Sequence, residues 1–184
     1  HILKKEEARI LKSYTAQLND ALVKDVKQKY GLNITIPKGY NLIAQRENFS
    51  WIQYDTKDLN QNLVIYTEPY SKQNTFTAEG MKEVISAFCR SNVPGPDEGT
   101  FMSLYEEYPP VFEEAALTDV YASKLVGLWR VDGAMMGGPF VCYALLDKSE
   151  QQVIYLYGFV FGPGKNKRNY VRQVDAIINS TIVH

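Results

Sequence analysis

The spacing of the apolar residues changes several times along the chain, and this feature limits the fold most. Near the N-terminus apolar residues recur three or four positions apart, at Ile10, Leu11, Tyr14, Leu18, Leu22, Val26 and Tyr30. That spacing places them on one face of a helix. Between residues 33 and 68 apolar and polar residues alternate, as in half-buried strands. A helical stripe, a second group of strands and a last helical stripe follow, and this order predicts an α+β fold.

We predict three helices, over residues 11–30, 78–90 and 168–180, packed on a sheet of about six to eight strands. The strands are expected at residues 33–37, 40–45, 49–54, 63–68, 100–105, 120–130, 140–146 and 152–161. Residues 55–62 are expected to form a polar hairpin loop, and residues 135–139 a turn between strands. Short links between successive strands favour a mainly antiparallel sheet.

The length of 184 residues favours a single α+β domain over residues 1–184. The sequence has no initiator Met and no signal-peptide segment, so we expect a mature protein or a fragment of a longer one. It also lacks an apolar run of about 18 residues, so no transmembrane helix is expected.

Charge and histidine content exclude several function classes. The 20 basic and 21 acidic residues give a net charge of -1, without the basic footprint of a nucleic-acid-binding domain. The two histidines are His1 and His184, at the chain ends, where an imidazole is rarely held rigidly. Histidine-based catalysis and metal sites are therefore not expected. Because phosphate-loop and calcium-loop motifs are also missing, we expect no cofactor and no metal.

Two cysteines, Cys89 and Cys142, each lie in an apolar segment. Such positions are typical of buried free thiols, and a disulfide between them is the alternative.

Charge is distributed unevenly in the second half of the chain. Seven acids and no base lie between Arg90 and Lys124: Asp97, Glu98, Glu106, Glu107, Glu113, Glu114 and Asp119. Four bases lie around the start of the last predicted helix: Lys165, Lys167, Arg168 and Arg172. Cations at a helix N-terminus oppose the helix dipole. We therefore predict that at least two of these bases reach carboxylates of residues 97–119, or that they surround a bound anion.

The segment around residues 127–140 is a second candidate for function. Trp129 and Phe140 are expected to be buried, and the turn at residues 135–139 is expected to line a cleft near Arg130. The candidate ligand or partner surface comprises Trp129, Arg130, Met135, Met136, Gly137, Gly138, Lys165, Lys167, Arg168 and Arg172.

Three functions remain open on these residues. We favour a non-enzymatic binding or accessory domain, whose surface would be an aromatic and glycine-rich patch. A second reading is a hydrolase without histidine, in which Glu106, Glu107 or Asp132 would act with Arg130 in a deep pocket. A third is a structural assembly module, which would leave the apolar face of its first helix exposed.

Three longer stretches carry a family resemblance: GYNLIAQRENFSWI at residues 39–52, GLWRVDGAMMGGPF at residues 127–140 and GFVFGPGKNKRNYVR at residues 158–172. Over about residues 30–178 the chain resembles an uncharacterised family of Bacteroidetes envelope proteins, domain of unknown function 4837. The resemblance implies a lipoprotein of the periplasm or outer membrane, which meets the membrane only through a lipid anchor outside this chain. It implies an envelope protein or a small ligand as partner, and it supplies no catalytic residues.

A looser similarity concerns the fold. A short strand followed by Ile-Pro-Lys-Gly-Tyr and strands that end in an Ile-Tyr run resembles the opening of the Mog1/PsbP-type α/β/α sandwich. That resemblance implies an accessory or binding subunit, although shared fold alone says little about function.

Overall fold

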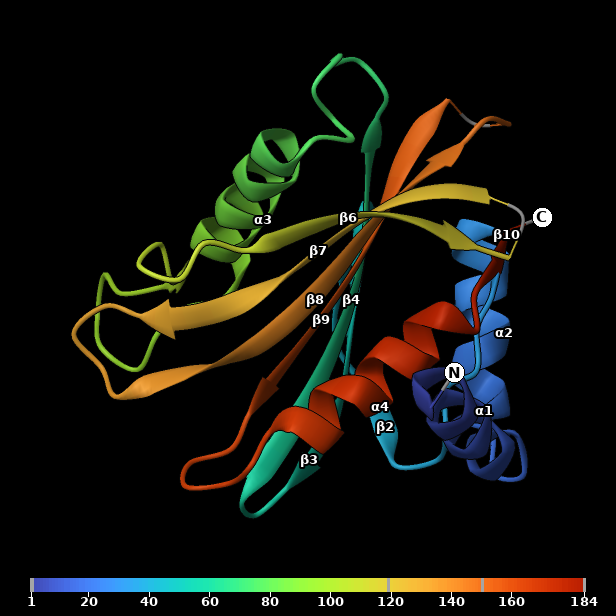
Figure 1. Cartoon of the computed structure of the whole chain (residues 1–184), viewed down its shortest axis with the longest axis horizontal. Helices are drawn as coiled ribbons and strands as arrows, with labels where there is room; N and C mark the ends of the chain where they lie inside the picture. Colours follow the sequence, from blue (N-terminus) through green and yellow to red (C-terminus); the bar gives the residue numbers. More distant parts are fainter. Residues whose placement is uncertain (1, 119, 150, 184) are drawn as a thin grey trace.

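The computed structural model describes residues 2–118, 120–149 and 151–183 of the chain. Its strands are β1 (Leu32–Asn33), β2 (Tyr40–Arg46), β3 (Phe49–Thr56), β4 (Leu59–Pro69), β5 (Met102–Leu104), β6 (Val111–Leu117), β7 (Val120–Val131), β8 (Met136–Asp147), β9 (Gln152–Phe161) and β10 (Ile182–Val183). Eight of them form one sheet in the order β2-β3-β4-β9-β8-β7-β5, with β6 also paired to β7 (Figure 1). The strand pairs are antiparallel, and β1 and β10 form a separate ribbon. A mainly antiparallel α+β fold is thus confirmed.

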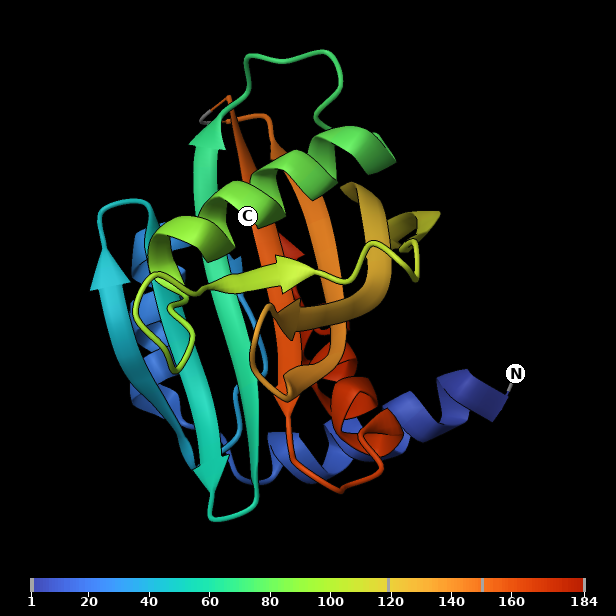
Figure 2. The same cartoon turned by 90° about the vertical axis from the view of Figure 1, so that its left-hand side faces the viewer.

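Four helices pack around this sheet in the described part of the chain: α1 (Ile2–Thr15), α2 (Asp20–Tyr30), α3 (Ala78–Asn92) and α4 (Arg168–Asn179). Helix α3 covers one face of the sheet, and α1, α2 and α4 lie on the other side (Figure 2). The helices predicted at 78–90 and 168–180 are confirmed. The Thr77 hydroxyl accepts a hydrogen bond from Gly80 N at 3.2 Å and caps α3, because the first N–H groups of a helix lack internal partners.

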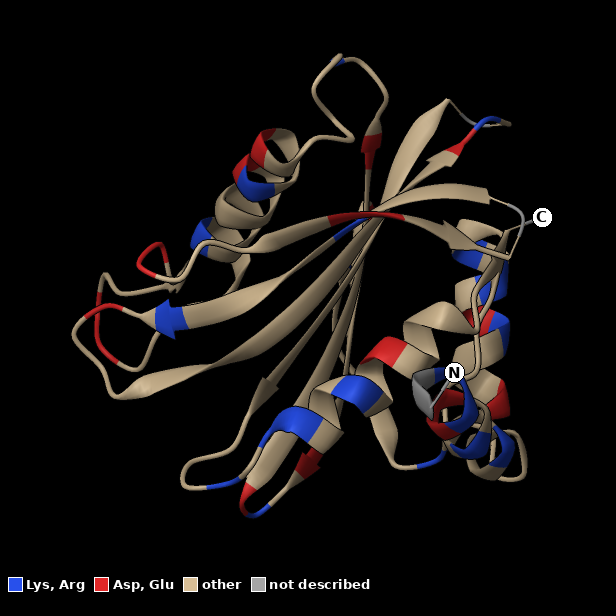
Figure 3. Cartoon of the chain, in the orientation of Figure 1, with Lys and Arg blue, Asp and Glu red and all other residues tan. Residues whose placement is uncertain are grey.

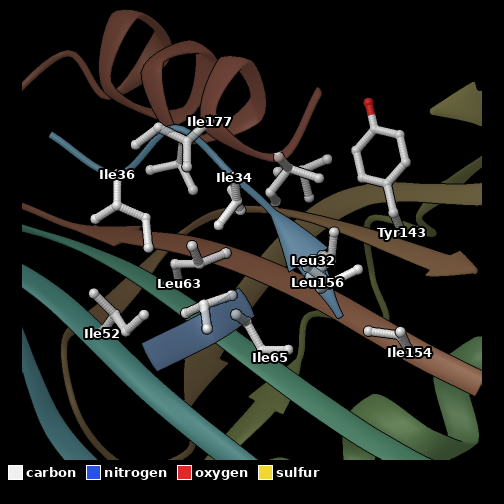
Figure 4. Packing of buried hydrophobic residues seen from close by; sticks show 14 of the residues in the cluster. Leu32, Ile34, Ile36, Ile52, Leu63, Ile65, Tyr143, Ile154, Leu156 and Ile177 are labelled. Atoms are coloured by element: carbon white, nitrogen blue, oxygen red, sulfur yellow. The ribbon is translucent and has the colours of Figure 1, made fainter. Parts of the chain in front are cut away.

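Each face of the sheet has its own hydrophobic core. On the α4 side, Leu63 and Ile65 of β4 and Leu156 of β9 pack toward Ile177 of α4 (Figure 4). On the α3 side, the core contains Phe88 of α3 and aromatic residues of the central strands. Because both faces are covered, β9 is buried at eight consecutive positions, 153–160, rather than at alternate ones.

The single helix predicted for residues 11–30 is wrong: the chain breaks between α1 and α2. Asn19 N donates to Ile36 O at 2.8 Å, and Lys38 N donates to Gln17 O at 2.8 Å. The Asn19 side chain accepts from Leu22 N at 3.3 Å and so caps α2. The backbone at residues 17–19 therefore bonds to a distant segment, which the helical periodicity cannot reveal.

Several predicted strands also differ from the structure. The strand predicted at residues 33–37 is reduced to β1, which pairs with β10 outside the main sheet. Residues 55–62 are mostly strand, because β3 and β4 remain paired as far as Thr56 and Leu59. Residues 136–139 belong to β8 and pair with β7, so the turn lies at residues 132–135 rather than 135–139. Strand β6 lies inside the acidic stretch and was not predicted, because Glu113 and Glu114 interrupt the alternation of apolar and polar residues.

Candidate functional site

An open cleft of about 780 Å³ lies between the β7–β8 hairpin and the loop that joins β9 to α4. It is lined by Tyr105, by residues 128–139 and by residues 165–167. We call it the hairpin cleft.

The hairpin cleft lies where neighbouring strands of the sheet separate. The pairing of β8 with β9 ends at Phe140 and Phe159. Beyond that point β8 continues with β7 alone to Met136, while β9 continues with β4 to Phe161. Figure 1 shows the β7–β8 hairpin leaving the direction of β9 and β4. The two halves of the sheet still touch at Gly138 and Val160, and beyond that contact they diverge, which leaves room for the cleft between the hairpin and the loop after β9.

Trp129 forms the buried end of this site. Its side chain is 3% exposed, and its ring lies 6.0 Å from the ring of Phe159 and 6.1 Å from that of Phe161. The indole Nε1 is buried and has no hydrogen-bond partner among the described residues. A buried donor without a partner is costly, so an acceptor that reached this N–H would be favoured.

Gly138 lets the indole occupy that position. A Cβ at residue 138 would lie 3.1 Å from Trp129 Nε1 and only 2.0 Å from the backbone oxygen of Val160. Such a contact is impossible without movement of the backbone. The glycine is therefore required by the close approach of β9.

Arg130 is held on the cleft wall by several neighbours. Its Nε lies 2.7 Å from Asp132 Oδ1 and its Nη1 lies 3.6 Å from Glu107 Oε1. The Nε contact is an ion pair without hydrogen-bond geometry. The guanidinium also lies over the Tyr105 ring, 4.8 Å from its centroid. The Asp132 and Glu107 side chains are each 70% exposed, so water screens these ion pairs.

The basic residues near the start of α4 do not pair as predicted. Lys165 Nζ lies 3.7 Å from Asp58 Oδ2, and Arg172 Nη1 lies 2.9 Å from Glu6 Oε2 of α1. In the described part of the chain, Lys167 and Arg168 have no ion pair. Among the described residues none of the four bases reaches a carboxylate of residues 97–118, which contradicts that part of the prediction. The end of β9 pairs with the start of β4, which places the loop beside the β3–β4 turn instead.

Figure 3 colours basic residues on α4 and the preceding loop, and acidic residues on β6. The anion version of the prediction stays a prediction. Asp119 of the acidic stretch, His1 and His184 lie outside the described residues.

Eight of the ten predicted surface residues line the hairpin cleft: Trp129, Arg130, Met135, Met136, Gly137, Gly138, Lys165 and Lys167. Arg168 and Arg172 do not line it. The predicted burial of Trp129 and Phe140 is confirmed. A ligand role for these residues stays a prediction.

The sequence prediction included Pro139 in the turn that lines the cleft, but it did not include Tyr105, Leu128, Val131, Gly133, Ala134 and Asn166. All of these except Tyr105 lie next to or close to predicted residues and could have been added on that ground. Tyr105 directly follows β5, and no local pattern ties it to Arg130.

The remaining reactive groups are not arranged as a catalytic centre. Glu106 lines a different cleft, beside α3, together with Glu79 and Glu83. Cys89 and Cys142 are buried free thiols, which confirms the first alternative given above. Burial raises the pKa of Cys89 to about 12. Among the described residues no group of three His, Cys, Asp or Glu side chains is placed to hold a metal ion.

Comparisons with known proteins identify a family. The model of a family described as domain of unknown function (DUF4837) matches residues 19–180. None of the curated proteins matches the chain.

Among solved structures, the chain is similar to the human StarD13 (DLC2) lipid transfer and protein localization domain. The identity is 11%, the match covers 88% of this chain and 94% of that chain, and the TM-score is 0.38. A likeness this weak carries no conclusion about fold or ligand. Within the described residues no helix is long and apolar enough to span a membrane.

Proposed function

Because the chain belongs to the DUF4837 family, whose function is unknown, we propose a role from its geometry: a non-enzymatic binding or accessory domain of the cell envelope. Its binding surface is the hairpin cleft. The partner is an envelope protein or a small ligand.

The observation that carries this proposal is the combination of groups at the cleft. Met135 is fully exposed, at 106% of its reference area, and Leu128 is 36% exposed. Large apolar side chains that stay exposed beside a concave surface are typical of interaction sites. Methionine suits such a surface because its flexible thioether adapts to different partners. Lys165 and Lys167 lie on the other rim and supply charge for orientation.

The hydrolase reading is less well supported. Glu107 and Asp132 both face Arg130 and both are largely exposed, and Glu106 belongs to the other cleft. A carboxylate that acts as an acid or base usually lies in a pocket that excludes water. The cleft is also open rather than deep.

The assembly-module reading expected an exposed apolar face on the first helix. In α2 that face is covered, because Leu22, Val26 and Tyr30 are buried in the core. Helix α1 lies against α4 and has an ion pair between Glu6 and Arg172. This arrangement favours a binding domain over a module that completes its fold on another chain.

The envelope location is part of the proposal and derives from the family resemblance. A lipid anchor outside this chain would hold the domain at the membrane. The analogy with the Mog1/PsbP-type sandwich, whose members are mostly accessory subunits, is likewise proposed, and it agrees with a sheet that has helices on both sides.

Photo-crosslinking in cells tests the binding role. A photoreactive amino acid at Met135 should give a discrete adduct in the envelope fraction of a Bacteroidetes host. The control places it at Tyr121, which is 52% exposed and lies at the other end of β7. Equal labelling patterns from the two positions, or no adduct from Met135, would contradict the proposal.

A further inference from the structure

We infer that the ligand of the hairpin cleft is an extended peptide segment of a partner protein, bound through a carboxylate. Apolar peptide residues lie on Met135 and Leu128, and the carboxylate lies between Lys165, Lys167 and the indole N–H of Trp129. This inference rests on the proposed function and adds the chemistry of the occupant.

The first argument is the charge on one rim of the cleft. Helix α4 has no acidic residue in its first turn, and its N-cap, Lys167, makes no side-chain capping bond. The partly positive N-terminus of the helix thus lies next to Lys167 and Arg168, which have no ion pair among the described residues. Lys165 has only a long contact with Asp58, and both side chains are about half exposed. Asn166 Oδ1 accepts from Arg168 N at 3.2 Å but carries no charge, so Asp58 is the one acidic partner that the described residues give Lys165, Lys167 and Arg168.

The second argument is independent of that rim. Trp129 Nε1 is a buried donor without a partner in the described structure. It lies beside Gly138, which lines the cleft, and a side chain at that position would crowd it. The hairpin turn at residues 132–135 bounds the cleft, and binding as proposed requires this wall to move outward so that an acceptor can reach the N–H. A carboxylate oxygen is the acceptor that satisfies both this N–H and a nearby lysine.

The apolar surface indicates a peptide rather than a small molecule. Tyr108 does not line the cleft, but it is 58% exposed and its ring lies 5.0 Å from that of Tyr105, so apolar surface continues beyond the cleft. A small ligand is usually enclosed over most of its surface, and this cleft is open. An extended chain can instead cover Met135 and Leu128 while one carboxylate reaches the lysines. That carboxylate belongs either to an Asp or Glu side chain or to a peptide C-terminus.

Selection from a random heptapeptide library, with the full chain as bait, tests this inference. The library is displayed in two formats: in one the peptide C-terminus is free, and in the other it is fused to a carrier. We expect selected peptides to combine Leu, Met or Phe with a carboxylate. Enrichment of Asp or Glu in the fused format assigns the carboxylate to a side chain. Enrichment in the free format without Asp or Glu assigns it to the C-terminus.

Nuclear magnetic resonance then locates the site. The chain has two tryptophans, and Trp51 Nε1 already donates to Asn62 Oδ1 at 2.9 Å, so it serves as an internal reference. The selected peptide should shift the indole N–H signal of Trp129 and leave that of Trp51 unchanged. Lys167→Glu should weaken binding about tenfold, because it replaces attraction by repulsion. The matched control, Lys24→Glu on the exposed surface of α2, should bind as the wild type does.

Several results would overturn the inference. If peptides without a carboxylate bind equally well, the carboxylate does not contribute to binding and the inference fails. It also fails if Lys167→Glu leaves the affinity unchanged. If vesicles of anionic phospholipid shift the Trp129 signal and no peptide is selected, the occupant is a membrane surface. If no peptide is selected but Met135 still crosslinks to a partner, the inference fails and the proposed binding function stands. If both fail, the proposed function fails as well.

Discussion

Replacement of Gly138 by alanine should strongly destabilise the protein, because the structure leaves no room for a Cβ. The added atom would lie 2.0 Å from the Val160 carbonyl oxygen, whereas ordinary contacts begin near 3.4 Å. The strands must therefore separate by roughly 1.4 Å, and overpacking of this kind costs about 1–3 kcal/mol. The indole of Trp129 is displaced too, which weakens two aromatic contacts of about 0.5–1.5 kcal/mol each. We expect a loss of about 3 kcal/mol, or roughly 6–12 °C in Tm.

Chemical denaturation followed by tryptophan fluorescence measures this loss. Gly99→Ala is the control, since Gly99 has a φ of +77° and an added Cβ there would meet no atom within 4 Å. That variant carries the strain of a left-handed backbone alone, about 1 kcal/mol. Should Gly138→Ala lie within about 0.5 kcal/mol of the wild type, the close approach of β9 to Gly138 and the account of the cleft based on it are wrong.

Three further predictions concern other parts of the fold. Asn19→Ala should cost about 1–2 kcal/mol of unfolding free energy in urea, since it removes the α2 cap, and Asn19→Ser should cost less. Cys89 and Cys142 should resist iodoacetamide in the native state and react once the protein is unfolded, because burial raises both pKa values; rapid native labelling would contradict this. The pKa of Glu7 is raised by burial and by the charge of Asp175, so Glu7→Gln should stabilise the fold slightly, by a few tenths of a kcal/mol at pH 7. That gain should shrink as the pH falls toward 4, where wild-type Glu7 binds a proton in both states, and unfolding curves at the two pH values check it.

Local sequence patterns predicted the helices and strands whose apolar residues follow a regular spacing within the element itself. The helical stripe over residues 78–90 predicted α3, because a helix satisfies its own backbone bonds and needs one apolar face. Strand β9 was predicted at its observed boundaries, since its apolar run is bounded by polar residues and by Gly162. The burial of Trp129 and Phe140 followed from their apolar surroundings.

Elements that depend on distant partners were not predicted. The break before Asn19 exists because the backbone there bonds to residues 36–38, which helical periodicity does not include. Strand β6 is an outer strand with four exposed residues at its start, so it lacks the alternation that marks a half-buried strand.

The candidate site divides in the same way. The residues of two segments about 30 positions apart supply its chemistry: aromatic, glycine, methionine and basic side chains. That these segments face each other follows from the fold, because the pairing of β8 with β9 ends at Phe140 and the β7–β8 hairpin then leaves the direction of β9. It also decided the ion-pair partners of Lys165 and Arg172, since charges attract over distances set by the fold rather than by position in the chain.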